Sequence, residues 1–306
     1  MASKSTGVVG CGWFGGAHCR IYDEISNLVA VCDVDGERAK KQGERYGVNW
    51  YVDHKKMLGS ESLDAVSIVV PPSQIPIVGY DFARAGVGVL LEKPLGVRVE
   101  DLRRLSEFSG SVRIMPGFIE IFNPVVERLR ESLDRIGSPV MAAARRIGRF
   151  PRRFWKIGVV LDLAFHDIYI FRHLFGDVDQ MRSMLSYYYD EEFEDAAVLL
   201  LELKSGVKGV IEANWLTPSK ERKMRIYGSE GVIEIDFIGQ DLRVFKDVMI
   251  GSTLTAKEDV VHPQALREPL ERELKAFLYS EKPPLTLEDG IEVLRLALEA
   301  SKKNQD

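Results

Sequence analysis

The chain has 306 residues, of which 45% are hydrophobic and 28% charged, a composition typical of a globular protein large enough for two domains. Its formal net charge of -5 argues against attraction of the whole molecule to nucleic acid or to an anionic membrane. No apolar run reaches the length of a membrane span, and the first residues lead directly into an apolar strand, so we expect a cytoplasmic protein without a signal peptide.

A short apolar run near the start of the chain ends in the glycine pattern Gly10-x-Gly12-x-x-Gly15, and a helical pattern follows. Gly10 would allow a tight turn, Gly12 would leave the backbone bare for a pyrophosphate, and Gly15 would let the helix pack closely on the strand. The amides of Trp13 and Phe14 would open the helix, where unpaired N–H groups attract phosphate. The alternative is a glycine-rich turn that binds nothing.

A second apolar run ends at Asp33, about 20 residues after the glycines. An acidic side chain at this place accepts hydrogen bonds from the ribose diol of adenosine and repels a 2′-phosphate. Asp33 therefore favours a dinucleotide-binding site over a glycine-rich turn that binds nothing. We expect NAD as the cofactor, with NADP as the alternative because Arg38 is nearby.

Strand and helix patterns continue to alternate through the first part of the chain. We expect strands at residues 28–32, 49–52, 65–70, 89–91 and 113–115, and helices at residues 17–25, 35–43, 54–58, 74–85 and 99–109. This alternation predicts an α/β domain with a doubly wound parallel sheet. Ligands of such sheets bind at the carboxyl ends of the strands, where we find Gly10, Asp33, Pro71 and Lys93.

The pattern changes after residue 118. We expect strands at residues 140–146, 181–189, 196–204, 209–213, 222–227, 232–237 and 242–245, and helices at residues 125–135, 162–175, 270–279 and 287–301. Successive strands at short spacing predict a mostly antiparallel sheet and hence a second, α+β domain. We place the first domain at residues 1–118 and the second at residues 119–306, with the last helix able to pack back on the first domain.

Lys93 is the first candidate for chemistry. Because Pro94 follows it, its backbone is biased toward an extended conformation, and it would project from the end of a strand beside the cofactor. A partly desolvated ammonium group there has a lowered pKa and can donate a hydrogen bond to a substrate oxygen. The alternative is a surface lysine in a turn.

Asp162 and His166 are the second candidate. Four residues apart on a helix, they share a face. His166 would act as a general base, and Asp162 would hold a substrate hydroxyl or favour the imidazolium that forms. The alternative is an acidic first turn followed by a packed histidine. No cysteine or histidine cluster offers further ligands, so we expect no metal site.

A basic run precedes that helix and consists of Arg145, Arg146, Arg149, Arg152, Arg153 and Lys156. Charge runs are usually solvated faces. This one could instead hold a phosphate or carboxylate group of the substrate, since it leads into the helix that carries the acid and the histidine.

Together these motifs resemble the glucose-fructose oxidoreductase, inositol dehydrogenase and rhizopine catabolism (Gfo/Idh/MocA) family. The resemblance covers nearly the whole chain and includes Pro71-Pro72-Ser73, Glu92-Lys93-Pro94 and Gly158-x-x-x-Asp162-x-x-x-His166. It implies a Rossmann domain followed by a domain with an open-faced sheet that mediates homodimers or homotetramers. It also implies that Lys93, Asp162 and His166 form a catalytic triad.

Four stretches look like the branch of that family that contains UDP-N-acetylglucosamine 3-dehydrogenases. They are Glu120-Ile-Phe122-Asn123-Pro124, Ile157-Gly-Val-Val-Leu-Asp-Leu-Ala-Phe-His166-Asp, Asn214-Trp-Leu-Thr-Pro218 and Gly228-Ser-Glu-Gly231. The resemblance implies cofactor contacts at Pro71, Pro72, Glu92 and Lys93. It implies substrate contacts at Lys93, Asn123, Arg149, Asp162 and His166, with the basic run near a diphosphate.

Several positions depart from the family pattern. Pro71-Pro72-Ser73-x-x-Pro76 replaces Thr-Pro-Asn-x-x-His, Phe118 and Ile121 replace a histidine and an arginine, and Lys156 and Ile157 replace two glycines. The substrate therefore does not follow from the resemblance. We expect an NAD(P)-dependent oxidoreductase for a secondary alcohol or ketone of a sugar, sugar derivative or nucleotide sugar. The alternative is a catalytically silent dinucleotide-binding regulator of the same fold.

Overall fold

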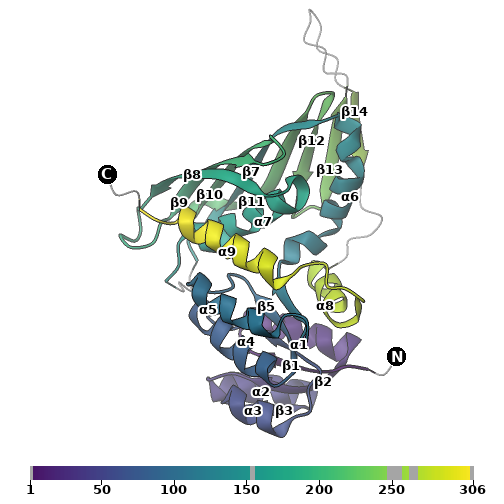
Figure 1. The fold of residues 1–306 in the computed structure, drawn as a ribbon, viewed down its shortest axis with the longest axis vertical. Helices are drawn as coiled ribbons and strands as arrows, with labels where there is room; N and C mark the ends of the chain where they lie inside the picture. The colour runs from purple at the N-terminus through teal and green to yellow at the C-terminus, as the bar shows by residue number, and fades with distance from the viewer. Residues whose placement is uncertain (1–2, 152–155, 247–256, 262–267, 304–306) are drawn as a thin grey trace, which may run out of the picture. The chain divides into compact units, whose positions relative to one another are not determined.

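The computed structural model describes residues 3–151, 156–246, 257–261 and 268–303, and its chain forms two compact units (Figure 1). Unit 1 comprises Met1–Phe118 and Leu270–Arg295, and unit 2 comprises Ile119–Pro269 and Leu296–Asp306. Helix α9 (Leu287–Ala300) contributes to both. None of the helices in the described ranges is long and apolar enough to cross a membrane.

Unit 1 contains a six-stranded sheet in the order β3-β2-β1-β4-β5-β6, in which all neighbouring strands are parallel. Its strands are β1 (Ser5–Val9), β2 (Asn27–Cys32), β3 (Asn49–Tyr51), β4 (Ala65–Ile68), β5 (Gly88–Glu92) and β6 (Ile114–Gly117). Every residue of β4 and β5 is buried, as expected for strands covered on both faces. The predicted doubly wound sheet is confirmed, and its order reverses between β1 and β4, where such folds bind ligands.

The helices of unit 1 begin and end at recognisable signals. They are α1 (Trp13–Ile25), α2 (Gly36–Tyr46), α3 (His54–Ser60), α4 (Ile75–Arg84), α5 (Val99–Arg103) and α8 (Pro269–Tyr279), with 3₁₀ turns η1 (Pro72–Gln74) and η2 (Arg104–Phe108). The side chains of Asp35 and Asp53 cap α2 and α3. The Arg113 guanidinium ties the end of α8 to this unit by donating to the carbonyls of Phe277 at 2.8 Å and Ser280 at 2.6 Å.

Unit 2 contains an eight-stranded sheet in the order β14-β13-β12-β11-β7-β10-β9-β8. Its strands are β7 (Pro139–Arg149), β8 (Val178–Ser186), β9 (Ala196–Leu203), β10 (Lys208–Asn214), β11 (Leu216–Gly228), β12 (Gly231–Asp236), β13 (Asp241–Lys246) and β14 (Lys257–Val261). Strands β7 and β10 pair in parallel, and the other pairs are antiparallel. The predicted mostly antiparallel sheet is confirmed, with β14 added as a strand that was not predicted.

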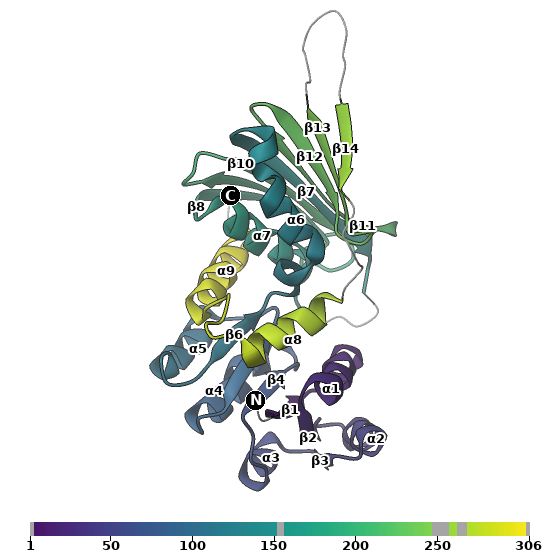
Figure 2. The same ribbon diagram turned by 90° about the vertical axis from the view of Figure 1, so that its right-hand side faces the viewer.

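Helices cover one face of this sheet. They are α6 (Pro124–Ser132) and α7 (Phe165–Phe175), accompanied by the short segments η3 (Ile119–Phe122), η4 (Leu133–Ile136) and η5 (Val160–Ala164). Helix α6 contacts β13 and α7 contacts β10 (Figure 2). Along β9, Leu199 and Leu201 are buried whereas Val198 and Leu200 are exposed, so the strand alternates between a covered and an open face.

Candidate active site

The glycine turn of unit 1 has the geometry of a pyrophosphate cradle. Gly10 has a φ of 101°, and a Cβ there would lie 2.0 Å from the Val69 carbonyl oxygen; one on Gly15 would lie 1.7 Å from the Gly10 carbonyl oxygen. A Cβ on Gly12 would meet nothing within 4 Å. Helix α1 begins at Trp13, whose amide was expected to open it, and therefore starts before the helical pattern at residues 17–25. Among the described residues no side chain caps it. Open space and uncapped amides at one helix start therefore fit a dinucleotide phosphate.

Asp33 follows β2 and is tied to this turn. One carboxylate oxygen accepts the N–H of Cys11 at 2.7 Å, and the other accepts the N–H of Asp35 at 2.9 Å. Each oxygen keeps a further acceptor position, so the group can also accept ribose hydroxyls. The Arg38 Nε lies 2.9 Å from a carboxylate oxygen of Asp35. The choice between NAD and NADP stays a prediction.

Glu92 is the last residue of β5 and lies against the main chain of Lys93. Its Oε2 accepts the Lys93 N–H at 3.1 Å, and its Oε1 is 3.2 Å from the Nε2 of His18. The other ring nitrogen of His18 is 3.0 Å from the Ser67 hydroxyl. The Glu92 side chain is buried and that of Lys93 half-buried, and the Lys93–Pro94 peptide is cis. Glu92 therefore fixes the main chain on which Lys93 is carried.

The two prolines after β4 differ in exposure. Pro71 is exposed and its carbonyl accepts the N–H of Gln74 at 2.8 Å, whereas Pro72 is buried at the start of η1. Pro71 can therefore face a ligand at the carboxyl end of the sheet, and Pro72 packs behind it. Their contact with a cofactor stays a prediction.

In unit 2, Asp162 and His166 lie on one continuous helical segment, but not on a regular α-helix. Asp162 belongs to η5, a single π-helical turn, and His166 to the first turn of α7. The helix predicted at residues 162–175 is present, but its first turn is π-helical and not α-helical. Such π turns inside helices occur frequently at functional sites. Both side chains are half-exposed, so both can meet a ligand.

The basic run is not a single surface. Arg146 is 1% exposed and donates two hydrogen bonds to Asp167, at 2.9 and 3.0 Å, and one to Glu120 at 2.9 Å. Burial lowers the pKa of the Arg146 guanidinium, but the two carboxylates raise it by more, so the group stays charged. The expected solvated face or substrate clamp is therefore wrong for Arg146, because its donors are used inside the unit.

The other members of the run are more accessible. Arg145 pairs with Glu212 at 3.0 Å, and Arg149 donates to the Pro218 carbonyl at 3.0 Å. Lys156 is exposed, while Arg152 and Arg153 lie outside the described residues. Arg145 and Arg149 are both exposed, and contact of Arg149 with a substrate stays a prediction.

Asn123 has a structural role at the start of α6. Its side-chain oxygen accepts the N–H of Val125 at 3.2 Å, and its amide donates to Glu120 at 3.0 Å and to the Phe237 carbonyl at 3.1 Å. It is 3% exposed. Because these bonds occupy the amide, we do not carry Asn123 into the proposed substrate site.

The structure thus groups the predicted residues within each unit. Unit 1 holds the glycine turn, Asp33 and Lys93; unit 2 holds Asp162 and His166. Convergence of Lys93 with the other two stays a prediction. In the described part of the chain, no three histidine, cysteine or carboxylate side chains are grouped to bind a metal ion.

Comparison with known proteins finds that two family profiles match this chain. The profile of the oxidoreductase family with an NAD-binding Rossmann fold (GFO_IDH_MocA) matches residues 4–111. The profile of the GFO/IDH/MocA C-terminal domain matches residues 126–234. The chain belongs to the GFO/IDH/MocA family of oxidoreductases.

Relatives of this family member are sugar or sugar-derivative dehydrogenases. UDP-N-acetylglucosamine 3-dehydrogenase of Acidithiobacillus ferrooxidans is 28% identical over 249 residues, covering 80% of this chain and 78% of that protein. Myo-inositol 2-dehydrogenase of Thermotoga maritima is 26% identical over 322 residues, covering 98% and 96%. A solved structure of the Acidithiobacillus protein matches at a TM-score of 0.88 and 26% identity, covering 98% of this chain and 97% of that one.

Two features of this GFO/IDH/MocA member were not predicted from its sequence. Glu194 holds the start of the π turn: its carbonyl accepts the N–H of Val159 at 2.9 Å and its carboxylate accepts the N–H of Val160 at 3.0 Å. Burial raises the pKa of this carboxyl, and the Val160 N–H opposes part of the rise. A Cβ on Gly158 would lie about 2 Å from the carboxyl group, so the glycine of the motif makes room for Glu194.

Positive charge on β11 is the second feature. Burial, and then the charge of Arg146, lower the pKa of Arg222 to about 10, while Asp167, then Glu120 and Asp162, partly oppose this. Partial burial and the charge of Arg222 lower the pKa of Lys220. Strand β11 therefore carries two cations, Arg222 and Lys220, that do not belong to the basic run.

Proposed function

We propose that this family member is an NAD-dependent dehydrogenase that oxidises a secondary alcohol of a sugar, sugar derivative or nucleotide sugar, or reduces the corresponding ketone. The observation that carries the proposal is the glycine turn anchored to Asp33, because it joins open backbone, uncapped amides and a ribose-binding acid at one end of the sheet. The names of the relatives support the sugar-like substrate.

We assign roles to three side chains of the chain itself. His166 takes the hydroxyl proton, Lys93 polarises the same oxygen, and Asp162 holds the substrate or favours the imidazolium. A bound nicotinamide supplies the hydride acceptor. Arg149, Lys220 and Arg222 are the cations that would suit a substrate phosphate group, which favours a nucleotide sugar.

The proposal is tested by measuring NAD reduction with inositols, free sugars and UDP-sugars, with NADP in parallel. We expect turnover with at least one of these classes and a preference for NAD. Lys93→Met should still bind NADH and lose about 10²-fold or more in kcat, whereas Lys55→Met, at an exposed lysine of α3, should keep full turnover. Unchanged turnover in Lys93→Met would remove this lysine from the mechanism.

The regulator is the outcome if no substrate is turned over. In that case NADH binding would persist, and binding of a partner protein would respond to the nucleotide. Because Lys93, Asp162 and His166 are all present, we favour the enzyme.

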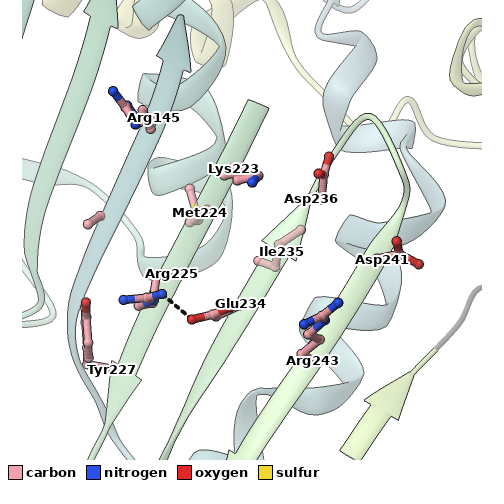
Figure 3. A pocket seen from close by; sticks show the side chains of 11 residues that line it. Arg145, Lys223, Met224, Arg225, Tyr227, Glu234, Ile235, Asp236, Asp241 and Arg243 are labelled. Atoms are coloured by element: carbon pink, nitrogen blue, oxygen red, sulfur yellow. Dashed lines mark ion pairs between the residues drawn. The ribbon is translucent and has the colours of Figure 1, made fainter. Parts of the chain in front are cut away.

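We also propose that the open face of the unit 2 sheet binds a second copy of this chain. It exposes Met184, Val198 and Leu200, which are 72%, 37% and 48% accessible. The same face carries charged residues of both signs around a hollow of about 410 Å³ (Figure 3), including the ion pair between Arg225 and Glu234. Apolar side chains among charges of both signs suit a self-complementary contact.

Light scattering after size exclusion tests the second copy. We expect a dimer or tetramer for the wild type and a monomer for Leu200→Glu, because a buried unpaired charge at the interface costs several kcal/mol. Ile77→Glu, which introduces the same charge at an exposed residue of α4, should keep the wild-type mass. A wild-type monomer would contradict the proposal.

A further inference from the structure

Two arginines lie directly opposite each other on neighbouring strands of unit 2. Arg222 of β11 is the register partner of Arg146 of β7, and residues paired in this way point to the same face of a sheet. Their neighbours Lys223 and Arg145 line the hollow on the open face (Figure 3), so the two arginines lie on the opposite face, which the helices cover. Like charges at opposed positions repel each other, so each arginine needs acceptors of its own.

Arg146 finds its acceptors inside the unit. The Nε and Nη2 groups form one edge of its guanidinium and donate to the two carboxylate oxygens of Asp167, at 2.9 and 3.0 Å. Its Nη1 donates to Glu120 at 2.9 Å. Two parallel N–H bonds to one carboxylate are the arrangement in which an arginine binds a planar anion most strongly. Arg146 therefore shows what this edge of a guanidinium can hold on this face of the sheet.

Arg222 has acceptors for one of its nitrogen groups only. Its Nη1 donates to the main-chain carbonyls of Ile147 and Glu221, both at 3.1 Å. Within the described residues its Nε and Nη2 have no hydrogen-bond or ion-pair partner. The side chain is half-buried, and neither nitrogen is among the fully enclosed polar atoms of the described chain. The edge that holds Asp167 in Arg146 is therefore open to a ligand in Arg222.

Lys220 adds a second cation on the same strand. It lies two residues before Arg222, where the register of β11 with β7 shifts between Leu216 and Glu221. Irregularities of this kind re-aim side chains and are frequent beside functional sites. Lys220 is exposed, and it too lacks an ion-pair partner in the part of the chain that the structure describes. The strand thus offers two positive charges that no described carboxylate pairs with directly.

The electrostatics of these two cations favour a bound anion. Burial is the first cause of the lowered pKa values of Arg222 and Lys220, and a neighbouring arginine is the second in each case. Both causes disfavour the charged form of the side chain. A negative charge close to Arg222 acts in the opposite direction, because it favours the charged form. An anion on the open edge therefore stabilises a cation that its surroundings do not fully compensate.

We propose that the Nε and Nη2 edge of Arg222 binds an anionic group of the substrate, a carboxylate or a phosphate, which makes Arg222 a specificity-determining residue. This rests on the proposed function, because it concerns the substrate of the same reaction. Carboxylates and phosphates share the chemistry that fits this edge: two negatively charged oxygens that accept parallel N–H bonds. Asp167, which Arg146 binds, directly follows His166. An anion on Arg222 therefore lies on the face of the sheet that the helix of the proposed base covers.

Isothermal titration calorimetry on the protein loaded with NADH tests the proposal. UDP-glucose and UDP-N-acetylglucosamine offer phosphate, glucuronate offers a carboxylate, and glucose offers neither. We expect at least one anionic probe to bind the wild type, and the probe that binds identifies the anion. In Arg222→Gln, whose amide can still donate to the main chain, the Kd of that probe should rise about 10- to 100-fold, because a charge-assisted pair of hydrogen bonds is lost.

Two further variants control this comparison. Arg222→Lys keeps the charge and loses the two parallel donors, so its Kd should lie between those of the wild type and Arg222→Gln. Arg130→Gln, at an exposed arginine of α6, should bind within about twofold of the wild type. Where Arg222→Gln does not fold, Arg222→Lys decides: a weaker affinity supports the proposal and an unchanged one overturns it.

Three results of the titrations overturn the proposal. They are no binding of any anionic probe to the wild type, an unchanged Kd in Arg222→Gln, and a loss of glucose binding by the same factor as the loss for the anionic probe. The last result would mean that the variant disturbs the site as a whole.

Kinetics separate this proposal from the proposed function. On an anionic substrate found by the screen above, Arg222→Gln should raise KM about tenfold or more and leave kcat nearly unchanged, since the contact is made equally in the ground and transition states. A lower kcat at unchanged KM would overturn the binding role. If nothing is turned over while Arg222 is still required for probe binding, the dehydrogenase fails and the anion site stands. Turnover of inositols without Arg222-dependent binding gives the reverse.

Discussion

At the scale of single residues, Asp33 joins cofactor recognition to the shape of the site. Its carboxylate accepts two main-chain N–H groups, one from the glycine turn and one from the loop that enters α2. An aspartate is suited to this because it has two oxygens and no donor when ionised. The same group that would bind the ribose therefore also holds the turn that would bind the pyrophosphate.

Asp33→Asn tests this double role. The asparagine amide can satisfy only one of the two N–H groups, so the turn loses an anchor and the ribose loses a charged acceptor. We expect the Kd for NADH, measured by quenching of protein fluorescence, to rise about tenfold. The ratio of the Kd for NADPH to the Kd for NADH should fall. Asp23→Asn on the exposed side of α1 is the matched control. Equal NADH affinity in both variants would contradict the role of Asp33.

Residue types alone predicted the groups that stand at strand ends, but not their partners. Gly10, Asp33 and Lys93 could be recognised because parallel strands bring their carboxyl ends to one edge. Arg146 could not, since its partners Asp167 and Glu120 come from a helix and a 3₁₀ turn elsewhere in unit 2. Glu194 was missed for the same reason: no local pattern links it to the helix that it caps.

At the scale of elements, the π turn of η5 depends on a residue from outside the helix. Val160 and Val159 lack intrahelical partners for their N–H groups, as the first residues of any helix do. Glu194 supplies both acceptors from the segment before β9. The position of Asp162, two residues later, therefore depends on the space that Gly158 leaves for that carboxyl group.

Gly158→Ala should displace Glu194 and disturb this start. We expect a loss of about 1–3 kcal/mol in the free energy of unfolding, because a buried carboxyl would lose its N–H donor, and a lower kcat with little change in NADH affinity. Chemical denaturation and kinetics measure the two effects. Gly148→Ala in β7 is the matched control, since its Cβ would meet nothing within 4 Å. Similar stability of the two variants would contradict the proposed cap.

The elements themselves were largely predictable, and their ends were not. The βα alternation and the buried strands follow from periodicity and from apolar runs, and both sheets were predicted correctly. The helix predicted at residues 99–109 divides at Arg103 into α5 and η2, because hydrophobic spacing does not separate α from 3₁₀ turns. Strand β14 was missed because Lys257, Glu258 and Asp259 make it strongly charged.

At the scale of the whole molecule, unit 1 is completed by a helix from the far end of the chain. Helix α8 brings Glu273 into the core, where the side chain is fully buried. Within the described residues neither of its carboxyl oxygens has a hydrogen-bond partner. Burial, and then the charge of Glu92, raises the pKa of Glu273 well above its ordinary value, so the folded protein holds a proton there.

This proton makes the stability of the fold depend on pH in a defined direction. The unfolded chain releases the Glu273 proton above a pH of about 4.3, whereas the folded chain releases it only at higher pH. The contribution of this proton to the free energy of unfolding is therefore greatest below a pH of about 4.3. It falls by about 1.4 kcal/mol per pH unit as the pH rises toward the pKa of the folded state. The Glu273→Gln variant has no carboxyl group at this position, so its stability should not show this decline with rising pH. In thermal melts between pH 5 and 9, the melting temperature of the variant relative to that of the wild type should therefore rise with each pH unit.

Glu271→Gln is the control for that comparison, because it makes the same chemical change on the same helix at an ion pair with Lys275. Its melting temperature should keep a nearly constant offset from the wild type, since a surface ion pair contributes little to stability. Curves for Glu273→Gln that run parallel to the wild type would mean that the folded state holds no extra proton at Glu273.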